Sequence, residues 1–257
     1  MFTIARNTIK EFVRNKILYV ILTVAVFFIF FSIILSTLAL READKIIIDF
    51  SLTMIEIFWL ITTIFLWSYL LYSELSKNTI LLILSKSPSK YKFILWKFVW
   101  FAFVIFLIYI VLSVAFFLVL YIHWIWIDIV YFFAIILSFF KILTLLSIII
   151  LLSIFTSPFI ALLVSISIYL ISHSTSFIKF YLVESGRVAQ WSIQHYFINS
   201  VYYIFPNFQD LSMKEHLLSP YLWSYTWMHI FFSITVAIIY IIIFLFIAVI
   251  IFNKKEF

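Results

Sequence analysis

The chain has 257 residues, of which 67% are hydrophobic and only 11% are charged, and its formal net charge is +6. Soluble domains carry about 25% charged residues, so this composition excludes an ordinary soluble protein. A single glycine, Gly186, excludes Walker A and Rossmann loops, which need several glycines close to phosphate. The absence of cysteine excludes disulfides, Cys-zinc sites and thiol catalysis.

Residues 2–16 are predicted to form an amphipathic elbow helix at the membrane surface. Arg6, Lys10 and Arg14 recur every four residues on one face, and apolar side chains recur at spacings of three and four on another. Such a helix lies in the interface, with its basic face toward anionic headgroups. Its role is either to anchor the first span alone, or to anchor the span and also contact a cytoplasmic partner.

Six apolar runs follow. A helix needs about 20 apolar residues to cross the hydrocarbon core. This rule places the spans at residues 17–40, 50–72, 97–122, 128–152, 157–173 and 228–252. The fourth and fifth spans are separated at Ser153 to Pro158, because proline interrupts the helical ladder; were it only a kink, five spans would remain. We therefore expect an all-α polytopic membrane protein, with one domain over residues 1–257.

The distribution of lysine and arginine predicts the orientation. With six spans and a cytoplasmic N-terminus, more of these residues fall on the inner face than on the outer face, and most acidic residues fall outside. This agrees with the positive-inside rule. Both termini are therefore expected in the cytoplasm.

The loop between the second and third spans, residues 74–92, is longer than a connection requires. Antiparallel helices need about 2–8 connecting residues. A stretch with Leu81 and Leu84 on its apolar face can form two helical turns before Pro88 stops it, and Ser89 can cap the next helix. This amphipathic stretch predicts a docking surface for a partner. The alternative is that its leucines lie on the bilayer.

The same loop resembles the cytoplasmic signature of ABC type-2 permeases. That signature has an acidic residue, a threonine, an apolar run, Ser-Lys-x-Pro, a hydroxyl residue, a basic residue and a lysine opening the next span. Here these are Glu74, Thr79, Leu81, Leu84, Ser85, Lys86, Pro88, Ser89, Lys90 and Lys97. Two positions depart from it: Asn78 replaces the usual glycine, and Lys90 replaces an arginine and loses bidentate pairing.

Further segments match in order along nearly the whole chain. Thr156-Ser157-Pro158, Tyr169 to His173 and Pro206-Asn207-Phe208 resemble the branch of that family associated with maturation of multi-copper enzymes. The resemblance implies a half-transporter without cofactors or enzymatic activity of its own. It would dimerise with itself or another permease, contact membrane lipids and not nucleic acid, and bind a separate ABC ATPase subunit through residues 74–92. It would export a substrate across the cytoplasmic membrane of a bacterium or archaeon.

Two charges fall inside predicted spans. Intramembrane charges are costly and by default indicate function. Glu56 lies early in the second span and Lys141 well into the fourth, so the predicted depths differ by about 12 Å. We therefore expect no direct ion pair. Glu56 is predicted to be hydrated near the outer surface, and Lys141 to mark the inner half of a dimer interface or a wet cavity.

The outer segment, residues 173–227, is rich in aromatic residues, so short re-entrant or interfacial helices are expected before the last span. All five histidines lie at or beyond the outer boundary, and Met213 and His216 could share a helical face. No dense ligand cluster is present, so no metal site is predicted.

Two alternatives to a permease stay open. One is a lipid-modifying intramembrane enzyme using His173, Glu184 and His195. Paired acid–base residues would be expected for such an enzyme, and the sequence has none close together. The other is a membrane anchor subunit without transport, which would not need the long loop.

Overall fold

The computed structural model describes residues 16–37, 42–76, 90–185, 187, 192–213 and 227–254, and this part of the chain contains helices and turns but no strand. A π-helical turn, η1 (Phe180–Glu184), extends α7, and the short α8 (Ile193–Ile204) precedes α10. Six helices are long and apolar enough to cross a membrane. They are α2 (Lys16–Ser36), α3 (Ala43–Ser76), α5 (Lys90–Ile122), α6 (Ile129–Phe155), α7 (Pro158–Lys179) and α10 (Trp227–Lys254).

The chain is thus a multi-pass α-helical membrane protein, as its sequence predicts. In a bilayer the backbone must satisfy its hydrogen bonds internally, and helices do so within each segment. The predicted elbow helix, with Arg6, Lys10 and Arg14, lies outside the described residues, as do residues 77–89 of the predicted docking loop.

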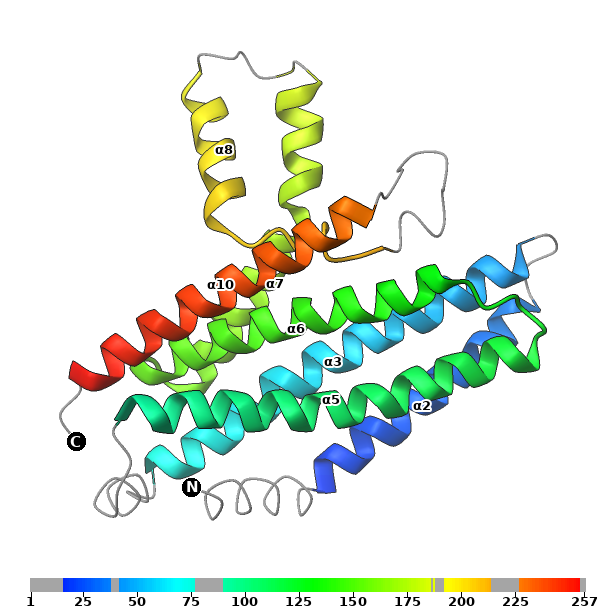
Figure 1. Cartoon of the computed structure of the whole chain (residues 1–257), viewed down its shortest axis with the longest axis horizontal. Helices are drawn as coiled ribbons and strands as arrows, with labels where there is room; N and C mark the ends of the chain where they lie inside the picture. The colour runs from blue at the N-terminus through cyan, green and yellow to red at the C-terminus, as the bar shows by residue number, and fades with distance from the viewer. Residues whose placement is uncertain are drawn as a thin grey trace.

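The long helices run side by side, with α6 at the centre of the bundle (Figure 1). Of the α6 span, 67% is buried, against 22% for each of the spans in α2, α7 and α10. Helix α6 packs against α3, α5, α7 and α10, whereas α2 packs against α3 and α5. Its central place explains why α6 carries the buried charge Lys141.

The two tight connections show how the sequence ends each helix. Between α6 and α7, the Ser157 hydroxyl caps α7 by accepting from the Ile160 N–H, and Pro158 opens the helix where no donor is needed. The predicted break at Pro158 is therefore confirmed. Between α5 and α6, Trp124 adopts a φ of 56°. Trp124 and Trp126 are almost fully exposed there, as expected for side chains at a membrane–water interface.

Helix α7 follows the bundle only at first. Its yellow-green C-terminal part stands away from the other helices beside α8 (Figure 1). The Lys179 ammonium holds the pair together by lying 4.0 Å from the ring centre of Tyr202 on α8. After α8, the chain returns to the bundle through residues 205–213, which we call the inserted segment.

Candidate functional site: a membrane-embedded ion pair

A salt bridge joins α3 and α6 inside the bundle. Lys141 Nζ lies 3.1 Å from Glu56 Oε1, and the two side chains are only 2% and 9% exposed. Helix α6 begins at Ile129, shortly after the exposed Trp124 and Trp126. Lys141 lies about 18 Å further along the helix axis. Since the hydrocarbon core is about 30 Å thick, the pair lies near the middle of the membrane.

This pair shows that the expectation of no direct contact between a hydrated Glu56 near the outer surface and Lys141, in the inner half of a dimer interface or a wet cavity, was wrong. The error came from the start of the second span. Its charged residues suggested a start at residue 50, but α3 begins at Ala43. Glu56 is therefore about 20 Å along α3, close to the depth of Lys141 on α6.

Two serine hydroxyls lie beside the same carboxylate oxygen, and the Ser138 hydroxyl also donates to the Ala134 carbonyl at the shorter distance of 2.8 Å. Ser138, one turn before Lys141, and Ser212, in the inserted segment, each place Oγ 3.4 Å from Glu56 Oε1. Ser138 could have been found from the sequence, because it is three residues from Lys141 and shares its helical face. No sequence signal indicates Ser212, since 156 residues separate it from Glu56.

The ion pair cannot be explained by stability alone. Removing two charges from water costs several kcal/mol per ion, and an apolar pair of similar volume often stabilises equally well. Charges kept within membrane spans commonly mark pathways or relays. This polar centre joins α3, α6 and an irregular segment. Movement of any of these elements can therefore change its hydrogen bonds and its ion pair.

The predicted docking loop connects two unusually long helices. Glu74 lies in the last turns of α3 and Lys90 begins α5, while Thr79, Leu81, Leu84, Lys86, Pro88 and Ser89 lie outside the described residues. Helices α3 and α5 are 34 and 33 residues long, or about 50 Å each, well beyond the 30 Å core. Their loop ends lie at the same end of the bundle as the end of α10 (Figure 1).

Aromatic packing links the start of α5 to the end of α10. The rings of Phe93 and Phe252 stack with their centres 5.9 Å apart. Lys97, part of the family resemblance, is 2% exposed and places its ammonium 5.5 Å from the Phe93 ring centre. The start of α5 and the end of α10 are therefore packed together at this end of the bundle.

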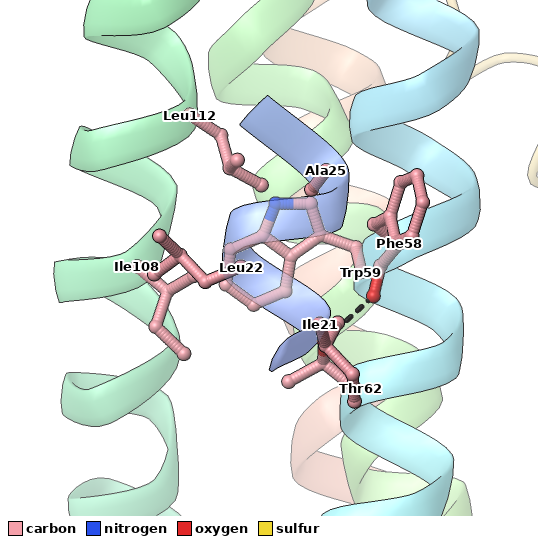
Figure 2. Close-up of a pocket in the computed structure, with 8 residues that line it drawn as sticks. All are labelled: Ile21, Leu22, Ala25, Phe58, Trp59, Thr62, Ile108 and Leu112. Carbon is pink, nitrogen blue, oxygen red and sulfur yellow. Dashed lines mark hydrogen bonds between the residues drawn. The ribbon is translucent and has the colours of Figure 1, made fainter. Parts of the chain in front are cut away.

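A small apolar cavity lies between α2, α3 and α5, lined by side chains such as Leu22, Phe58 and Ile108 (Figure 2). Trp59 also lines the cavity, and its buried indole N–H has no hydrogen-bond partner among the described residues. The nearby Thr62 hydroxyl donates to the Phe58 carbonyl at 2.7 Å. The cavity, about 10 Å³, can hold at most one water, so it is too small for an organic ligand.

The described histidines do not gather into a metal site. The described residues contain no group of three His, Asp or Glu side chains that could hold a metal ion. His173 stacks on Tyr169, and His195 packs edge-on against Tyr196. Met213 is buried in the inserted segment, whereas His216 lies outside the described residues.

Comparison of the chain with protein-family models, curated proteins and solved structures finds no match. The fold and the buried pair thus define a class, the multi-pass α-helical membrane proteins with an ion pair within their spans.

Proposed function

We propose that this chain is the membrane-spanning permease subunit of an ABC exporter. The observation that carries the proposal is the α3–α5 hairpin. Both helices are longer than the hydrocarbon core is thick, and the segment between them resembles an ABC type-2 coupling loop. A simple connection between neighbouring helices requires neither the length nor this sequence.

In this proposal a separate ATPase subunit supplies the energy. The single glycine leaves no phosphate-binding loop within the 257 residues. The ATPase subunit binds residues 74–92 on the cytoplasmic side of a bacterial or archaeal membrane, and two permease subunits form the transporter. Its movement on binding and hydrolysing ATP is passed into the membrane along α3 and α5.

The contacts of these two helices support such a coupling. Helix α3 carries Glu56, so a shift of α3 acts directly on the ion pair with Lys141. Helix α5 packs against α10 through Phe93 and Phe252, so it carries the same movement to the last span. The hairpin and the membrane centre are therefore mechanically connected through continuous helices.

The first test concerns docking. We would purify the Leu81→Asp/Leu84→Asp variant with a candidate ABC ATPase subunit, using Ile127→Asp in the α5–α6 connection as a control. Ile127 is 42% exposed at the opposite end of the bundle. We expect the loop variant to lose co-purification and stimulation of ATPase activity, whereas the control keeps both. Equal behaviour of the two variants would remove the proposal.

The second test concerns sidedness. Because the chain has no cysteine, a single Ser87→Cys or Trp126→Cys substitution gives one reactive thiol. A membrane-impermeant maleimide added to intact cells should label position 126 and spare position 87. Labelling of position 87 alone would place the loop outside, where no ATPase can bind it.

A further inference from the structure

The inserted segment is an irregular stretch buried at membrane depth. Phe208, Leu211, Ser212 and Met213 are each less than 9% exposed, and all but Ser212 belong to the hydrophobic core. Ser212 reaches Glu56, which places the segment near the middle of the membrane. Non-helical backbone is tolerated at this depth only where protein or a water-filled cavity surrounds it.

Hydrogen bonds hold the segment in a defined turn. The Gln209 N–H donates to Asn207 Oδ1 at 3.2 Å, and the Ser212 N–H donates to the Gln209 carbonyl at 2.9 Å. The Phe208 N–H donates to the Ser172 carbonyl of α7 at 3.1 Å. The segment is therefore a small folded unit that docks on α7, not a slack connection.

Ser212 makes a polar contact between the segment and the ion pair. Its hydroxyl donates at 3.4 Å to the same Glu56 oxygen that accepts from Lys141 at 3.1 Å. A carboxylate is a stronger acceptor for such a hydroxyl than the neutral amide of a Glu56→Gln variant. The attachment of the segment to α3 therefore includes this contact with Glu56.

We propose that the inserted segment is a plug latched to the Glu56–Lys141 ion pair by Ser212, and that disturbing the pair releases it. Phe208, Leu211 and Met213 of the plug pack in the hydrophobic core, and because apolar packing is not directional, the unit can shift as a whole. The hydrogen bond to Ser172 keeps the plug attached to α7 when the latch opens.

A role of this release in transport rests on the proposed function. A shift of α3 driven from the α3–α5 hairpin would separate Glu56 from Lys141 or Ser212, and the plug would leave the centre of the bundle. Interrupted helices with irregular segments near the membrane midplane commonly form transport sites. The latch itself does not depend on the motor that drives α3.

The test introduces single cysteines as labelling reporters, because the chain has no cysteine of its own. Met213→Cys reports on the plug, because position 213 is 3% exposed and the substitution leaves Ser212 in place. Ser147→Cys, in α6, is the matched control, since its side chain is fully buried and its hydroxyl bonds only within its own helix. The rate of labelling by N-ethylmaleimide is measured in proteoliposomes for both positions.

Both reporters are combined with Glu56→Gln/Lys141→Met, which removes the charges together, and with Ser212→Ala, which removes the latch alone. We expect labelling at position 213 to accelerate at least tenfold in both backgrounds, and labelling at position 147 to stay unchanged. Ser212→Thr should keep the slow rate. An unchanged rate at position 213, or a parallel rise at position 147, would overturn the latch.

Addition of the ATPase subunit and ATP separates the two proposals. Faster labelling at position 213 with ATP supports both. If charge removal accelerates labelling but ATP never does, the latch stands and its role in transport fails, whereas the exporter assignment fails only if the ATPase subunit does not co-purify.

Discussion

Removal of Lys141 alone is expected to destabilise the bundle strongly. At the observed 3.1 Å, and with an effective dielectric constant of about 20, the gross attraction between the two charges is about 5 kcal/mol. Lys141→Met leaves Glu56 buried without its cation, although the serine hydroxyls still donate to it. Loss of one partner of a buried pair costs about 3–5 kcal/mol, and we expect a loss of that size.

The measurement is a reversible unfolding titration in mixed micelles of sodium dodecyl sulfate, followed by circular dichroism. The double variant Glu56→Gln/Lys141→Met leaves no charge uncompensated and should unfold within about 1 kcal/mol of the native chain. Lys45→Met is the matched control, because Lys45 and Glu42 are 2.9 Å apart but 48% and 64% exposed. Exposed pairs contribute about 0–1 kcal/mol.

Two results would refute this reasoning. If Lys141→Met costs no more than Lys45→Met, the embedded pair is solvated in the membrane. If the double variant is as unstable as Lys141→Met, the loss arises from packing around position 141 and not from an unpaired Glu56.

Two further predictions use the same unfolding assay. Ser51→Leu should cost about 1–3 kcal/mol by overpacking α2 against α3, because Ser51 is fully buried and its hydroxyl lies 3.2 Å from that of Ser32; Ser51→Ala should cost about 0.6 kcal/mol. Trp59→Phe should stay within about 1 kcal/mol, since the lost packing is offset by removal of an unpaired N–H, whereas Trp59→Ala should cost about 3–5 kcal/mol.

The number of spans could be predicted because hydrophobic length is a local property. Each apolar run is long enough to identify a helix. The break before α7 could also be predicted, because Ser157 can cap a helix and Pro158 has no backbone N–H to donate. The start of α3 could not be predicted in this way. Asp44 is charged, but it lies in the first turn of α3, where an acidic side chain favours a helix N-terminus.

The wrong start of α3 is the reason why the sequence did not predict the Glu56–Lys141 ion pair. A shift of about seven residues in the start of α3 changes the apparent depth of Glu56 by about 10 Å, enough to separate it from Lys141. The contact with Ser212 is a different case. It depends on where α7 bends and on how residues 205–213 turn back, and both are set by packing between distant segments.

The separation of the two charges along the chain has a consequence for synthesis. Glu56 precedes Lys141 by 85 residues, which ribosomes add in about 4–17 s at 5–20 residues per second. During that interval α3 enters the bilayer with an acidic group whose counter-ion has not yet been translated. The newborn span therefore carries this acidic group without Lys141 until α6 has been synthesised.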